Sequence, residues 1–100
     1  ASELLARRAP APNDRVRAAL HVHRAVLALA RDDGTGARAE LERARGFAPE
    51  SAQLALASAL VLQGEGRLEE ALDTIRTAVA RHPDDPDLQA RHAELLAAFG

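Results

Sequence analysis

The sequence has no cysteine, methionine, tryptophan or tyrosine, and its only aromatic residues are Phe47 and Phe99. Without cysteine there is neither a disulfide framework nor a thiolate metal site, and the compartment stays open between cytoplasm and periplasm. The scarcity of aromatic residues disfavours a β-sheet core, because strands are rich in aromatic and β-branched side chains. No apolar run is long enough to span a bilayer, and no signal-peptide pattern is present. These absences favour a small helical domain.

Lysine is also missing, so all 13 basic residues are arginine. Together with the many alanines, this composition indicates the codon bias of a GC-rich genome, such as many bacteria have. The formal net charge is −2, and residues of both signs alternate along the chain. No basic field exists to attract nucleic acid or an anionic membrane, so we expect neither as a partner.

The residues that are present point to one central helix. The run from Ala52 to Leu62 has almost no polar side, and a helix that is apolar all round is normally buried. A chain of 100 residues supports one modest core, so this helix is expected to lie at its centre.

Apolar periodicity and helix-breaking residues predict four further helices around it. The predicted helices cover about 14–31, 37–47, 52–62, 68–81 and 86–99, after an N-terminal arm over 1–13 that contains Pro10 and Pro12. Asp84 or Asp85 is expected to cap the last helix. The connections are short, so neighbouring helices should run antiparallel.

The chain also repeats itself at a constant interval. The pairs that match at this interval are Ala37 with Ala71, Leu41 with Ile75, Ala44 with Ala78, and Pro49 with Pro83. A period of about 34 residues predicts an array of helix pairs. We call this interval of 34 residues, as between Ala37 and Ala71, the repeat spacing.

The segment from Gly66 to Leu72, GRLEEAL, with Pro83 following later in the chain, resembles the tetratricopeptide repeat. Small residues stand where that family packs two helices closely, namely Ala59, Ala71 and Ala78. The resemblance implies an all-α solenoid of about two helix hairpins, over 18–51 and 52–85, and a C-terminal capping helix over 86–99. Residues 14–100 would then form a single domain.

The first helix fits this repeat less well. If the repeat spacing held strictly, it would direct His21, Arg24 and Ala28 toward the core, and burying an unpaired arginine is costly. We therefore expect a shift by a single position, which buries Val22, Ala25, Val26 and Leu29. His21, Arg24 and Arg31 would then form the polar outer face of an end unit.

Candidate catalytic and metal-binding residues have simpler explanations. His21 and His23 point to different sides of one helix, while His82 and His92 are isolated, so no metal site is expected. Asp84, Asp85 and Asp87 are explained as helix-capping residues. No serine lies near a base at the spacing of a nucleophile, and no glycine-rich segment follows a strand. We expect no cofactor and no enzymatic activity.

The resemblance instead implies protein binding, because first helices of successive repeats line a concave groove in this family. The residues predicted to line it are Leu20, His23, Leu27 and Ala30, then Leu56, Leu60 and Gln63, then Asp87, Ala90 and Glu94. A groove of leucine and alanine suits an apolar or amphipathic peptide.

Two alternatives to an open groove remain. In the first, the chain is a self-associating scaffold, such as a homodimer, whose groove is covered by a second copy or by the 1–13 arm. In the second, the chain is an appendage of a larger enzyme or assembly.

Overall fold

A computed structural model describes residues 12–99; helices make up 84% of these residues, and none of them forms a strand. The helices are α2 (Pro12–Ala30), α3 (Gly34–Phe47), α4 (Ala52–Gly64), α5 (Leu68–Arg81) and α6 (Pro86–Phe99). The prediction of an all-α repeat with five helices is confirmed. Of the predicted arm over 1–13, residues 1–11 lie outside the described residues, and Pro12 and Asn13 belong to α2 instead. No described helix is long and apolar enough to cross a membrane.

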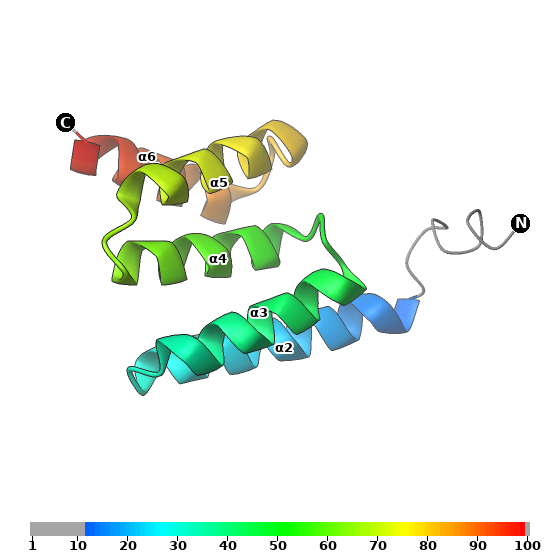
Figure 1. The fold of residues 1–100 in the computed structure, drawn as a ribbon. Helices are drawn as coiled ribbons and strands as arrows, with labels where there is room; N and C mark the ends of the chain where they lie inside the picture. The colour runs from blue at the N-terminus through cyan, green and yellow to red at the C-terminus, as the bar shows by residue number, and fades with distance from the viewer. Residues whose placement is uncertain (1–11, 100) are drawn as a thin grey trace, which may run out of the picture.

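The helices follow one another as antiparallel neighbours (Figure 1). α2 pairs with α3 and α4 pairs with α5, while α6 packs on the second pair. α4 contacts each of the other described helices, which explains why its sequence is apolar on nearly every side. The prediction that this segment forms the central helix is confirmed.

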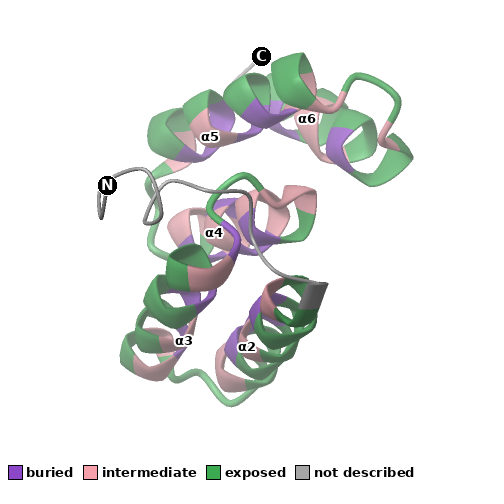
Figure 2. Ribbon diagram, turned by 90° about the vertical axis from the view of Figure 1, so that its right-hand side faces the viewer, coloured by how far each residue is buried: buried purple, intermediate pink, exposed green. Residues whose placement is uncertain are grey.

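Two clusters of buried side chains hold the fold together, and α4 contributes to both. The first cluster joins α2, α3 and one side of α4, through Ala18, Val22, Ala25, Ala37, Leu41, Ala44, Ala48, Leu54, Ala57 and Val61. The second joins the other side of α4 with α5 and α6, through Ala59, Ala71, Leu72, Ile75, Ala78, Leu88 and Leu95. Figure 2 shows the buried segments on the sides where the helices face one another. Many of these residues are alanine, and their small side chains let two helices approach closely.

The ends of α2 and α4 repeat the same local structure. Asp32 has a φ of 61°, and Gly66, one repeat spacing later, has a φ of 79°. In each case the next N–H donates to a carbonyl in the last helical turn, that of Ala28 at 2.8 Å or that of Leu62 at 2.9 Å. This left-handed residue after the helix is a common C-terminal cap, which glycine and aspartate tolerate better than most residues. Because the two caps are equivalent, the repeat spacing holds strictly between α2 and α4.

The shift by a single position predicted for the first helix is therefore wrong. Ala25 and Ala59 are both completely buried and are separated by the repeat spacing. Of the four residues that the shift would bury, Val22 and Ala25 are buried and Leu29 packs partly buried against the first cluster, but Val26 is 41% exposed. Strict spacing does not bury Arg24, because its counterpart Ser58 lies only at the edge of the packed side of α4. Arg24 is exposed, as predicted, but for this different reason.

The starts of α4 and α6 follow the expected capping chemistry. The Asp85 carboxylate accepts hydrogen bonds from the backbone N–H groups of Asp87, at 3.0 Å, and Leu88, at 3.1 Å. The Ser51 hydroxyl accepts one from Leu54 N–H at 3.3 Å. The interpretation of the aspartates near residue 85 as capping residues is thereby confirmed for Asp85.

Candidate protein-binding site

The structure divides the residues predicted to line a concave groove among three surroundings. On α2, Leu20 and Leu27 are 47% and 44% exposed, and His23 between them is exposed. With strict spacing their counterparts on α4 are Leu54, Ala57 and Val61, which are buried in the first cluster. Leu20, His23 and Leu27 therefore lie on the side of α2 that corresponds to a packed side of α4. No described helix covers this side of α2.

On α4 the predicted residues are half-buried. Leu56 packs against the second cluster, and Gln63 has a buried side-chain oxygen with no hydrogen-bond partner among the described residues. Leu60 belongs to neither cluster. On α6, Asp87 and Glu94 are exposed, and Glu94 accepts a hydrogen bond of 2.9 Å from Arg91. Leu60 is thus the α4 residue most available on this side, and the binding role of the set stays a prediction.

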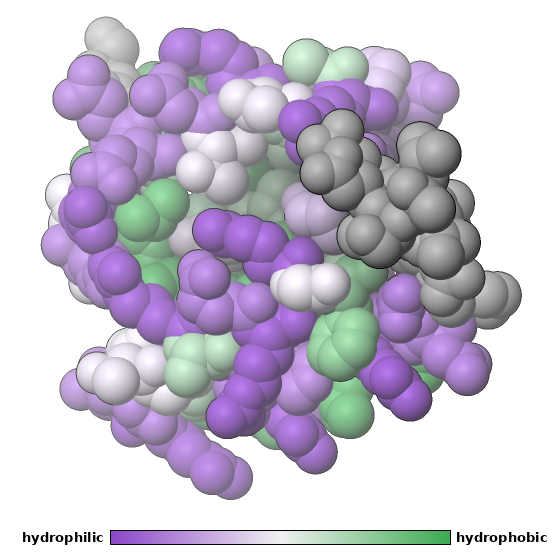
Figure 3. All heavy atoms as spheres, turned by 45° about the vertical axis from the view of Figure 1, so that its right-hand side comes forward, coloured by the Kyte–Doolittle hydropathy of each residue, from purple (hydrophilic) through white to green (hydrophobic). Residues whose placement is uncertain are grey.

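A different groove lies between α3 and α5, which do not contact each other. It has a volume of about 870 Å³, and α4 forms its floor. Figure 3 shows hydrophobic and pale residues inside a hollow whose edges are hydrophilic. Sequence reasoning missed this groove, because its walls carry the alternating charges of an ordinary solvated helix face.

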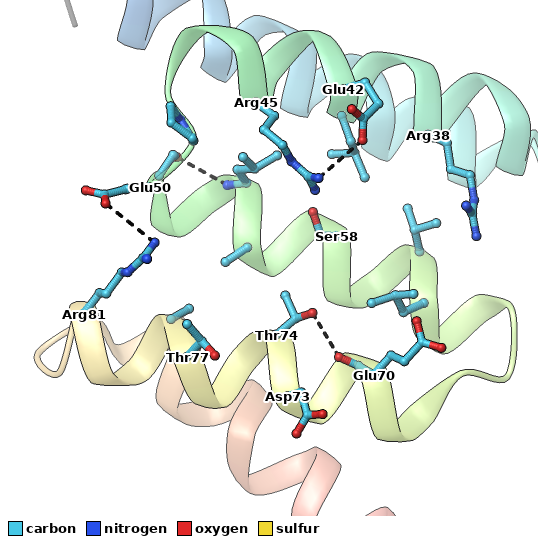
Figure 4. A pocket seen from close by; sticks show the side chains of 18 of the residues that line it. Arg38, Glu42, Arg45, Glu50, Ser58, Glu70, Asp73, Thr74, Thr77 and Arg81 are labelled. Atoms are coloured by element: carbon cyan, nitrogen blue, oxygen red, sulfur yellow. Dashed lines mark hydrogen bonds and ion pairs between the residues drawn. The ribbon is translucent and has the colours of Figure 1, made fainter. Parts of the chain in front are cut away.

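The floor of the groove is mostly apolar. It is formed by Ala55, Ser58 and Leu62, which are half-buried, and by the sides of the buried Leu54 and Val61. In Figure 4, Ser58 lies on α4 between the two walls. Its hydroxyl is buried without a hydrogen-bond partner among the described residues, although a buried hydroxyl normally has one.

The walls are lined with charged side chains that pair with one another. Arg45 lies 3.4 Å from Glu42 on α3, and Asp73 lies 3.3 Å from Arg76 on α5. Thr74 and Thr77 add hydroxyl groups to the α5 wall (Figure 4). Because the acids and bases on each wall offset one another, the groove has no strong charge of either sign.

Ion pairs connect the two sides of the groove at both ends. At one end Arg38 of α3 donates from Nε to Glu65 in the α4–α5 turn at 2.8 Å, and Arg67 lies 3.6 Å from the same carboxylate. At the other end Arg81 of α5 lies 3.8 Å from Glu50 (Figure 4). The hydrogen bond from Arg38 is the largest effect on Glu65 and lowers the pKa of that carboxyl below its usual value. These pairs are exposed, so each is expected to hold the groove open only weakly.

His21 is predicted to lie on the polar outer face of the first helix, but its side chain contacts α3. Its Nδ1 donates a hydrogen bond of 2.7 Å to Glu40, and its ring stacks on Phe47 with 5.8 Å between centroids. Arg17 also lies over Phe47, 5.7 Å from the ring centre. The two polar residues therefore join α2 to the outer edge of α3.

This contact predicts a dependence of stability on pH. The hydrogen bond from His21 is the largest cause that lowers the pKa of Glu40. A carboxyl whose pKa is lowered by folding stabilises the protein above its unfolded pKa of about 4.3, and this stabilisation is lost as the pH falls through the folded pKa. The Glu40→Gln variant should be less stable than the parent at neutral pH, and the difference should shrink in acid. Urea unfolding at several pH values measures it; Glu42→Gln, at an exposed position on the same helix, is the control. A difference that is constant with pH would contradict this assignment.

Among residues 12–99 no group of three or more histidine, aspartate or glutamate side chains is arranged to hold a metal ion. The described structure thus presents packing surfaces and a groove, with no such cluster of metal-ligating side chains.

One known family matches most of this chain. A family model of the tetratricopeptide repeat matches residues 28–95, from the end of α2 through most of α6. This chain belongs to the tetratricopeptide repeat family. Searches of curated proteins and of solved structures returned no match. α2, α4 and α6 occupy equivalent places at the repeat spacing, and we call them the first helices; α3 and α5, which alternate with them, we call the second helices.

Membership of the tetratricopeptide repeat family supports a general role in protein interaction. The fold is typically non-catalytic. The groove between α3 and α5 and the exposed leucines of α2 are two surfaces that the described helices leave uncovered.

Proposed function

We propose that this chain is a non-catalytic interaction module that binds an apolar or amphipathic segment of a partner protein in the groove over α4. The observation that supports this proposal is the absence of contact between α3 and α5, which leaves about 870 Å³ of open space above an apolar floor. A volume of this size lies in the range of ligand sites in proteins.

The chemistry of the groove favours an amphipathic occupant. Apolar side chains of a bound segment would cover Ala55 and Leu62 on the floor, which removes apolar surface from water. Polar side chains and backbone groups would face the threonines and the paired charges of the walls. Because these charges already have partners, the binding energy should come mainly from the floor, and the dependence on salt should be modest.

The concave surface predicted from the sequence is a second proposed site. It lies on a different side of α4, since Leu56, Leu60 and Gln63 do not line the groove between α3 and α5. The exposure of Val26 and of the half-buried Leu60 favours it, because the two residues are equivalent in the repeat and both present apolar surface.

Peptides selected from a random library against the parent chain test the proposal. We expect the enriched sequences to carry apolar residues on one side. Their affinity should fall by at least about tenfold for Thr77→Arg, because a long charged side chain would enter the groove from the α5 wall. Ala80→Arg is the matched control, since Ala80 is exposed on the same helix and does not line the groove.

Binding that survives Thr77→Arg but is lost in Leu60→Arg would indicate that the peptide binds at the concave surface and not in the groove between α3 and α5. Failure to enrich any peptide, with a parent chain that is folded by circular dichroism, would contradict both proposals.

A further inference from the structure

One side of each first helix carries apolar residues at two positions that recur at the repeat spacing, with a variable residue between them. The sets are Leu20, His23 and Leu27 on α2, Leu54, Ala57 and Val61 on α4, and Leu88, Arg91 and Leu95 on α6. On α4 all three residues are buried against α2 and α3, and on α6 both leucines are buried against α4 and α5. We call this side the front face of a first helix. Among the described first helices, the front face is open on α2 alone, with Leu20 and Leu27 nearly half exposed.

A complementary surface is open at the other end of the molecule. We call it the back face of α6; its members are Ala90, Ala93, Leu96 and Ala97, all exposed. On α2 the equivalent back face includes Val22 and Ala25, which belong to the same buried cluster as the front face of α4. Figure 1 places α2 and α6 at opposite ends, with α4 between them. One copy thus presents both halves of a contact that the fold already makes internally between α2 and α4.

Charge favours joining these two faces over joining two copies of α2. From Asp14 to Arg31 the exposed charged residues are four arginines, Arg15, Arg17, Arg24 and Arg31, and Asp14 is the only acid in this stretch. The segment around α6 has four acids, Asp84, Asp85, Asp87 and Glu94, with Arg91 as the only basic residue besides His92. Two α2 helices side by side would bring like charges together, whereas α2 beside α6 brings opposite charges together.

We propose that copies of this chain associate head to tail, with the front face of α2 in one copy packed on the back face of α6 in the next. This contact is heterologous, so it can propagate from copy to copy. It involves one helix from each copy, a smaller contact than a stable dimer normally buries, so self-association should be weak and should increase with concentration.

Sedimentation velocity over a range of concentrations tests the proposal through two variants. Leu27→Asp alters the front face of α2, and Ala93→Asp alters the back face of α6. Each should weaken self-association at least about tenfold, because a carboxylate would enter an apolar contact. An equal mixture of the two should form a one-to-one heterodimer, since each variant keeps the face that the other lacks. The heterodimer should not grow further.

Val26→Asp is the matched control for α2. Val26 is exposed to a similar extent, and its counterpart Leu60 belongs to neither buried cluster, so this variant should associate like the parent. Circular dichroism of each variant confirms that it is folded. None of the three positions lines the groove between α3 and α5, so the result is independent of peptide binding in that groove.

Three results would overturn head-to-tail association. The first is a parent that stays monomeric up to about 1 mM, the weak limit of specific binding. The second is an effect of Leu27→Asp without any effect of Ala93→Asp, which would instead indicate pairing of α2 with α2. The third is a mixture of the two variants that forms no heterodimer.

Discussion

The Ala71→Arg variant is expected to be largely unfolded at room temperature. Ala71 is completely buried in the second cluster, where α5 packs against α4 and α6. An arginine there adds volume to a packed core, which costs about 1–3 kcal/mol, and introduces a buried charge without a partner, which costs several more. A domain of this size has a total stability near the lower end of about 5–15 kcal/mol. The sum of these costs is comparable with the whole stability.

Circular dichroism and thermal melting measure this outcome. Ala80→Arg places the same side chain on the same helix at an exposed position, so it should melt close to the parent. A cooperative transition near the parental temperature for Ala71→Arg would show that Ala71 is not at a tight helix crossing, and the repeat assignment would be in doubt.

The helix positions could be predicted from the sequence because the local signals were consistent. Leu68, Ala71, Leu72, Ile75 and Ala78 recur at helical spacing, and the predicted bounds of 68–81 agree with those of α5. The start of α3 was harder to place. The predicted helix begins at residue 37, but Gly34 and Gly36 lie in the first turn of α3, where the Asp33 carboxylate accepts a hydrogen bond from Gly36 N–H at 2.9 Å. A capped helix start tolerates glycine, which a simple breaker rule does not recognise.

The register of α2 could not be settled from residue types alone. The expected shift followed from the assumption that strict spacing buries Arg24. In the structure this position lies at the edge of the packed side, where Ser58 is half-buried on α4 and a longer polar side chain reaches solvent on α2. Burial at such an edge depends on the distance between helices, and the sequence does not contain that distance explicitly.

The groove between α3 and α5 was not predictable for a related reason. Arg45, Glu42 and Asp73 have the pattern of ordinary exposed helix residues, and only the separation of the two helices makes them line a common space. The concave residues could be proposed only through the family resemblance. Leu20 and Leu27 of α2 are exposed, but the shifted register that placed them in the concave groove is wrong, and they lie instead on the side that corresponds to Leu54 and Val61 of α4.

The second large effect is expected at the leucines of the front face. Leu54 and Leu88 are 3% and 1% exposed, so replacing either with alanine should cost about 2–5 kcal/mol through lost burial and the cavity that remains. Leu20 occupies the same place in the repeat but belongs to neither buried cluster of the described helices. Its replacement with alanine should change the stability of a dilute sample by about 0.5 kcal/mol or less.

Urea unfolding of Leu20→Ala, Leu54→Ala and Leu88→Ala at low protein concentration therefore tests the central claim most directly. That claim is that one packing face recurs at the repeat spacing, is covered on α4 and α6, and is open on α2. The structure predicts large losses for Leu54→Ala and Leu88→Ala and almost none for Leu20→Ala. A loss for Leu20→Ala equal to the other two would contradict it, because the front face of α2 would then be covered within a single copy.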